Sequence, residues 1–117
     1  MRKPLAFAIV LLFVAATPFL WVNPSRGADL DQGKNLYSQK CAICHGHNGA
    51  GDGPAAASLT PQPSNFTKAG FWHRKNIDQI ISTTILKGHG PMPPFHMNAT
   101  QLKALIDYMK HSFKPAG

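Results

Sequence analysis

Apolar residues recur with the period of an α-helix in two segments of the chain, and Leu36 and Tyr37 can pack on one side of an earlier segment, which together predicts three helices. The segments cover residues 29–40, 77–87 and 99–113. The second has an apolar stripe formed by Ile77, Ile80, Ile81, Thr84 and Ile85, and the third a stripe formed by Leu102, Leu105, Ile106, Met109 and Phe113. The stretches between these segments are rich in glycine and proline, which predicts irregular loops.

Residues suited to helix ends support these boundaries. Asn76 can cap the second helix, and Gly88 is expected to end it. Asn98 can cap the third helix, where Gln101 three residues later completes a capping box. Gly33, within the first helix, would let another helix approach closely, and a tolerated surface glycine is the equal alternative.

The stretch 46–70 is the longest irregular part of the chain. Its glycines do not form a phosphate-binding loop, because no Gly-Lys-Ser/Thr sequence follows them. Residues 55–59 are expected to form one helical turn within it. Phe66, Phe71 and Trp72 form an aromatic cluster, for which core packing is the main interpretation and a partner-binding patch the alternative.

The first 28 residues have the order of a secretory signal peptide. A short basic start precedes the uncharged apolar run 5–22, and small and polar residues follow. The run is also long enough to span a bilayer, so an uncleaved membrane anchor through residues 5–22 is the alternative. In both cases residues 29–117 would form one domain outside the cytoplasm, and we expect a periplasmic location.

The chain is strongly basic. Its 12 Lys and Arg against 5 Asp and Glu give a net charge of +7. Without the three basic residues of the first 28, nine remain against five acidic ones, a net charge of +4. This charge favours partners with acidic docking surfaces. No basic run or recognition motif supports a nucleic-acid partner.

Residues 41–45 read Cys-Ala-Ile-Cys-His, the spacing at which a c-type haem is attached covalently. Residues three apart share one face of a helical turn, so Cys41 and Cys44 can both add to vinyl groups along one porphyrin edge. His45 can then bind the iron. No βαβ pattern supports a thioredoxin-like dithiol, no second cysteine pair completes a zinc site, and a disulfide closing so short a loop would add little stability.

A six-coordinate haem iron needs a second axial ligand besides His45. Met92 is the main candidate, because prolines on both sides stiffen its loop and limit where its sulfur can lie. The alternative is that Met92 only packs on the core. His89 and His96 flank it and are the runners-up. A methionine ligand would raise the reduction potential relative to two histidines.

Together these features resemble a known family, the bacterial monohaem class I cytochromes c. The resemblance covers residues 31–113 and rests on three motifs in order: 41–46 (Cys-Ala-Ile-Cys-His-Gly), 51–54 (Gly-Asp-Gly-Pro) and 92–95 (Met-Pro-Pro-Phe). Residues 63–67 resemble a branch found in small periplasmic cytochromes and in cytochrome domains of larger redox complexes.

The resemblance implies an all-α class I cytochrome c fold, with three to four helices packed around one covalent haem c and the terminal helices crossing near Gly33. It also implies His45 and Met92 as the axial ligands, and a hydrogen bond from the His45 ring to the carbonyl of Pro54 that orients the imidazole. His89 and His96 depart from the family pattern and would allow a ligand switch.

The predicted function is to carry single electrons between periplasmic or membrane redox partners. We do not expect an enzyme, because no general base, nucleophile or substrate pocket is visible, although the chain would suit a subunit or partner of an oxidoreductase complex. The first alternative is a haem c gas sensor or peroxidase-like protein with a labile sixth ligand. The second is a non-haem module with a metal or dithiol site, which would leave a thin core.

Overall fold

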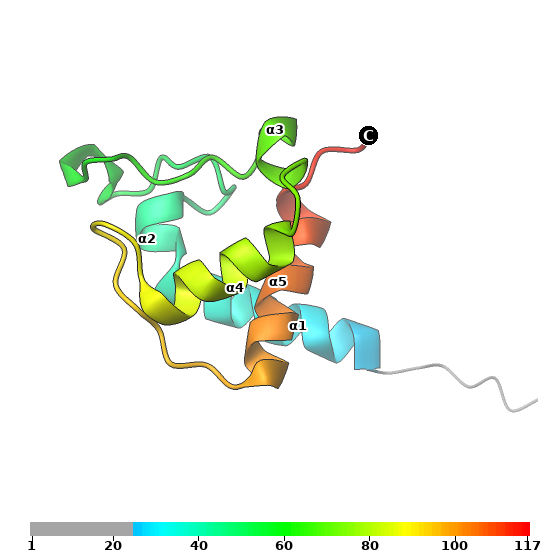
Figure 1. Cartoon of the computed structure of the whole chain (residues 1–117). Coiled ribbons are helices and arrows are strands. Elements are labelled where there is room, and N and C mark those ends of the chain that lie inside the picture. Colours follow the sequence, from blue (N-terminus) through cyan, green and yellow to red (C-terminus); the bar gives the residue numbers. More distant parts are fainter. Residues whose placement is uncertain (1–24) are drawn as a thin grey trace, which may run out of the picture.

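The computed structural model describes residues 25–117, and this part of the chain is helical (Figure 1). Its long helices are α1 (Ser25–Lys40), α4 (Ile77–Lys87) and α5 (Ala99–Phe113). Its short elements are α2 (Ala42–His45), the 3-10 turn η1 (Ala56–Ser58) and α3 (Ala69–Trp72). The expected all-α fold is therefore confirmed, including the helical turn expected within residues 55–59. Helix α3 is an addition that the sequence pattern did not predict.

Helix α1 is already formed at Ser25, the first described residue, upstream of the start expected at residue 29. The expected boundary between a signal peptide and the mature domain, at residue 28, therefore falls inside this helix. The apolar run 5–22 lies outside the described residues, so the choice between a signal peptide and a membrane anchor stays a prediction. In the part of the chain from residue 25 onward, no helix is long and apolar enough to cross a membrane.

Helices α1 and α5 cross and form the most extensive helix contact of the described chain (Figure 1). Gly33 is buried at the crossing, and a Cβ atom placed on it would lie 2.1 Å from the carbonyl oxygen of Ala104. It would also lie 2.6 Å from Cβ of Tyr108. Only glycine allows two backbones to approach this closely. The expected crossing near Gly33 is confirmed, and a tolerated surface glycine is excluded.

The core is apolar and draws on most of the helices. Tyr37 of α1 and Leu105 of α5 are its most deeply buried large side chains. The other buried hydrophobic members are Cys41, Ala42, Phe66, Trp72, Ile81, Ile85, Ile106, Met109 and Phe113. Of the aromatic cluster, Phe66 and Trp72 thus belong to the core, as the main interpretation held, whereas Phe71 is half-buried and packs against it. The stripe of α4 is narrower than predicted, because Ile80 is 41% exposed.

The two expected caps have different outcomes. Asn98 and Gln101 form the predicted capping box at the start of α5, with hydrogen bonds of 2.8 and 3.0 Å between each side chain and the other's backbone N–H. Asn76 makes no side-chain cap at α4, which corrects the expectation. Its φ of 57° places it in the left-handed region, which asparagine tolerates better than most residues. Asn76 therefore serves the turn between α3 and α4.

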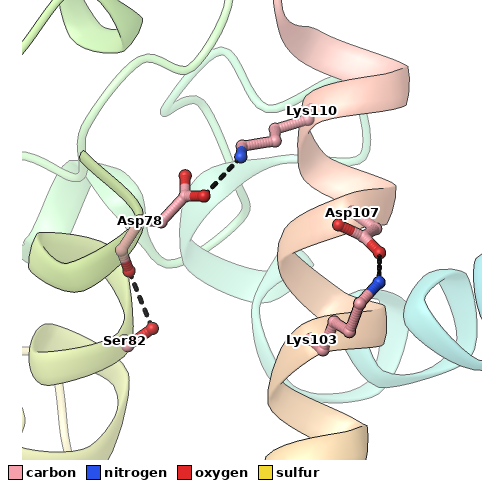
Figure 2. A network of polar contacts seen from close by, with 5 residues as sticks. All are labelled: Asp78, Ser82, Lys103, Asp107 and Lys110. Atoms are coloured by element: carbon pink, nitrogen blue, oxygen red, sulfur yellow. Dashed lines mark hydrogen bonds and ion pairs between the residues drawn. The ribbon is translucent and has the colours of Figure 1, made fainter. Parts of the chain in front are cut away.

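A polar network on the surface joins α4 to α5 (Figure 2). Lys110 Nζ of α5 lies 2.5 Å from Asp78 Oδ2 of α4, and Ser82 Oγ donates to the Asp78 carbonyl at 2.7 Å. Lys103 and Asp107 form a second ion pair within α5. Exposed pairs of this kind contribute little stability. The pair with Lys110 means that Asp78, the first acidic residue after Asp52 in the sequence, already has a basic partner.

Candidate functional site

Helix α1 leads directly into the turn that carries the cysteine motif. Cys41 N–H donates to the Tyr37 carbonyl at 2.9 Å, and His45 N–H donates to the Cys41 carbonyl at 2.9 Å. These bonds place Cys41, Cys44 and His45 on one helical turn, as predicted. Both cysteines are free thiols, Cys41 buried and Cys44 half-buried. Burial raises the pKa of the Cys41 thiol to about 11, so it is protonated at neutral pH.

The His45 ring is fixed through its Nδ1 atom, which lies 3.2 Å from the carbonyl oxygen of Ser64. A carbonyl can only accept, so Nδ1 carries the proton and Nε2 keeps a lone pair that can bind a metal. Burial lowers the pKa of His45, an effect that the bond to Ser64 partly opposes. The imidazole is therefore neutral at neutral pH, which is the form that binds iron.

The acceptor of this hydrogen bond differs from the expected one, which was the carbonyl of Pro54. Pro54 is exposed, although its neighbours hold it beside α2: Gly53 N–H donates to the Cys44 carbonyl at 3.0 Å, and Ala55 N–H to the Ile43 carbonyl at 2.9 Å. The described residues show no hydrogen bond between Pro54 and His45. The expectation about the acceptor is corrected to Ser64, and a role for Pro54 in binding the cofactor is left as a prediction.

Phe66 explains why Ser64 reaches the imidazole. Its ring stacks on His45 with centroids 4.6 Å apart and an interplanar angle of 21°. Its backbone N–H donates to the Gly49 carbonyl at 2.7 Å, and its carbonyl accepts from Trp72 Nε1 at 2.6 Å. These contacts of Phe66 hold the segment around Ser64 close to α2. Sequence reasoning missed Ser64 because it acts through a backbone carbonyl, which leaves no side-chain signal.

The chain after His45 turns sharply and is tied back to α1. Gly46 has a φ of 79°, and a Cβ atom on it would lie 2.2 Å from Asp52 Oδ1. Its carbonyl accepts a hydrogen bond from the buried hydroxyl of Tyr37 at 2.8 Å. Burial raises the pKa of Tyr37 well above its usual value, so this hydroxyl stays protonated. Helix α1 thus holds Gly46, the first residue of the loop that follows the motif.

Met92 lies in a tight turn between α4 and α5. Backbone bonds of 3.0 Å run in both directions between His89 and Met92, and Gly88 takes a φ of 75° at the end of α4, as expected of a terminating glycine. The Met92 side chain is half-buried and packs against the same core cluster that contains Cys41. His89 and His96 are exposed. The structure therefore directs Met92, and neither flanking histidine, towards the core.

The residues of this site fit a haem c. Two free thiols on one helical turn suit two thioether bonds, and a neutral imidazole with Nε2 unprotonated suits iron ligation. Met92 adds a thioether that already packs on the core. Over residues 25–117 no group of three or more His, Cys, Asp or Glu side chains is placed to hold a metal ion.

Comparison with known proteins agrees with this site. The model of the family described as cytochrome c oxidase, cbb3-type, subunit III matches residues 28–109. A cytochrome c-553-like protein of Synechocystis sp. is 28% identical over 88% of this chain and 93% of its own length. Cytochrome c6 of Nostoc sp. is 28% identical over 76% of this chain and 74% of its own. These relatives do not favour the gas-sensor or peroxidase alternative.

A solved structure is also similar. A chain of the reducing HAO-like protein complex of Kuenenia stuttgartiensis superposes with a TM-score of 0.56 and 30% identity, over 69% of this chain. The match spans 41% of that chain, so it concerns one part of a larger protein. The family match covers well over half of the present sequence and includes the cysteine motif. The chain therefore belongs to the cytochrome c family, in the group described by subunit III of cbb3-type cytochrome c oxidase.

Proposed function

We propose that this protein is a monohaem cytochrome c that carries single electrons between exported redox proteins. The observation that supports this most is the turn at residues 41–45, where two free thiols accompany a histidine whose Nδ1 is engaged by Ser64 and whose Nε2 is available. When bound, the haem iron supplies a one-electron ferric/ferrous couple. The chain holds the group through Cys41 and Cys44 and orients its ligand His45.

In this proposal Met92 would supply the second protein ligand of the haem iron, besides His45. Its turn is already formed by the paired backbone bonds with His89, so little conformational entropy is lost when the sulfur binds. A thioether ligand together with a histidine would favour ferrous iron and raise the reduction potential. The exposed His89 and His96 would have to turn inward to compete, and we do not assign them as ligands under neutral conditions.

The partners in this proposal are redox proteins with acidic docking surfaces. Two observations support protein partners: the relatives are named as cytochromes, and the solved neighbour is a chain of a protein complex. The net charge of +4 over residues 29–117 supports acidic surfaces. We further propose that the protein works in the periplasm, on the order of charged and apolar residues in its first 28 positions.

Covalent attachment can be tested on the protein purified after expression with a haem-attachment system. We expect an intact mass increased by one haem and a pyridine spectrum typical of two thioether bonds. Cys44→Ser should keep at most one thioether and shift that spectrum, while Ser38→Ala, an exposed change on α1, should leave mass gain and spectrum unaltered. A purified protein of unmodified mass without visible absorbance would refute the proposal.

A further inference from the structure

Basic residues gather around α3 without acidic neighbours in the sequence. No Asp or Glu occurs between Asp52 and Asp78, while Lys68, Arg74 and Lys75 all fall in this interval. All three are exposed. Asp78, which ends the interval, is paired with Lys110 on α5 (Figure 2) and does not neutralise them. The segment is therefore a local concentration of positive charge.

A series of aromatic contacts links this segment to His45. The rings of His45 and Phe66 are stacked at 4.6 Å, and those of Phe66 and Phe71 meet at 4.9 Å with an angle of 61°. Phe71 is half-buried, and the guanidinium carbon of Arg74 lies 5.3 Å from its ring centroid. The series thus begins at the candidate iron ligand and ends at a ring that is partly open to solvent beside a cation.

Helix α3 is held firmly against this series. Trp72 Nε1 donates to the Phe66 carbonyl at 2.6 Å, and Trp72 itself is buried. Phe71 N–H donates to the Lys68 carbonyl at 3.0 Å, so the lysine that precedes α3 is fixed relative to the ring. The backbone that carries the basic residues is therefore already ordered, which lowers the entropic cost of docking.

We propose that the surface formed by Lys68, Phe71, Arg74 and Lys75, here called the α3 surface, docks the acidic face of a redox partner protein. This inference rests on the proposed electron-carrier function and adds a location to it. The charge of the α3 surface complements an acidic face, and its ring contacts bring the docked partner to the side of His45. In the exchange the partner loses one electron and the iron gains one, with no bond made or broken.

The first test maps the contact on the haem-loaded protein by nuclear magnetic resonance. The probe is oxidised flavodoxin, an acidic flavoprotein, added at about 10 mM ionic strength. We expect amide shifts concentrated in residues 68–75. Shifts concentrated instead around Ile43, which is 60% exposed beside the cysteines, or around residues 88–97 would overturn the proposal.

The second test measures reduction of the ferric protein by reduced flavodoxin in a stopped-flow instrument. Lys68→Glu and Lys75→Glu should each slow the second-order rate about 30-fold at low ionic strength, because each reversal removes about 1 kcal/mol of attraction for one charge pair at roughly 4 Å in water and adds about as much repulsion. The rates should converge with wild type at about 1 M salt. The matched controls are Lys34→Glu on α1 and Lys87→Glu at the end of α4, which should slow the rate less.

Equal slowing by all four reversals, or the largest effect from Lys87→Glu, would overturn the α3 surface as the docking site. An anionic lipid surface is the competing occupant. It would be indicated if the protein bound phosphatidylglycerol vesicles through residues 68–75 while flavodoxin caused no shifts there, and this outcome would also overturn the proposal. If any of these outcomes came with the low-spin spectrum of a haem c, the docking proposal would fail while the proposed electron-carrier function stayed intact.

Discussion

Replacing Gly33 by alanine tests the crossing of α1 and α5, on which the rest of the domain is built. The added methyl would lie 2.1 Å from a backbone oxygen, that of Ala104, and 2.6 Å from Cβ of Tyr108. Neither atom can rotate away, so the helices themselves must separate. The helix that carries Cys41 at its end would shift with them.

The expected free-energy change follows from two opposing effects. Overpacking in a well-packed core costs up to about 3 kcal/mol, and a contact with backbone belongs at the upper end of that range. Alanine is favoured over glycine in a helix by about 1 kcal/mol. Gly33→Ala should therefore lower the free energy of unfolding by about 2 kcal/mol, which for a domain of this size lowers Tm by about 8–16 °C.

The assay is guanidinium unfolding of the haem-loaded protein, followed by far-ultraviolet circular dichroism at pH 7. Gly70→Ala is the matched control, because Gly70 lies in α3 with no atom within 4 Å of an added Cβ. The control should be neutral or slightly more stable. If Gly33→Ala were as stable as Gly70→Ala, the close helix crossing would be wrong.

Two further predictions concern the hydroxyl of Tyr37 and the caps of α4 and α5. Tyr37→Phe leaves the Gly46 carbonyl without its donor and should cost about 1–2 kcal/mol of unfolding free energy at pH 8. Because burial raises the pKa of Tyr37 in the folded protein, the unfolded chain loses its proton first, and wild-type stability should fall as pH rises above about 10. Guanidinium midpoints at pH 8 and 11 should show a smaller fall in Tyr37→Phe, and equal falls would contradict the assignment. Asn98→Ala should cost about 1 kcal/mol by removing the capping box. Asn76→Gly should cost nothing in the same measurement, because φ at Asn76 is 57° and no capping bond is lost; a loss as large as that of Asn98→Ala would show that Asn76 caps α4 after all.

Features that depend on neighbouring residues could be predicted from the sequence. The stripes of α4 and α5 and the capping box at Asn98 are set by spacings of three and four residues, which the pattern displays directly. The turn at residues 41–45 is equally local. Gly33 was ambiguous in the sequence, because whether a helical glycine faces another backbone depends on which helix crosses it.

Features that depend on contacts between distant segments could not be predicted. The bond from His45 to Ser64 joins residues 19 positions apart and uses a backbone oxygen, so no choice of side chain signals it. Asn76 suits a helix cap and a left-handed turn equally well, and only the geometry between α3 and α4 decides. Ile80 extends the apolar stripe of α4 in the sequence, yet it lies 41% exposed at its margin.

The central claim is a haem c held by Cys41 and Cys44 and ligated by His45 and Met92. The measurement that tests it most directly is the optical spectrum of the purified protein, oxidised and then reduced with dithionite, compared with that of Met92→Ala. We expect sharp low-spin bands in the reduced protein and a weak near-infrared band in the oxidised one, which arises from methionine bound to ferric iron and disappears in Met92→Ala. Met97 is also half-buried and packs against the same core cluster as Met92, so Met97→Ala is the control and should keep the band. A high-spin or bis-histidine spectrum in the wild-type protein would contradict ligation by Met92, and the absence of haem bands would contradict the whole account.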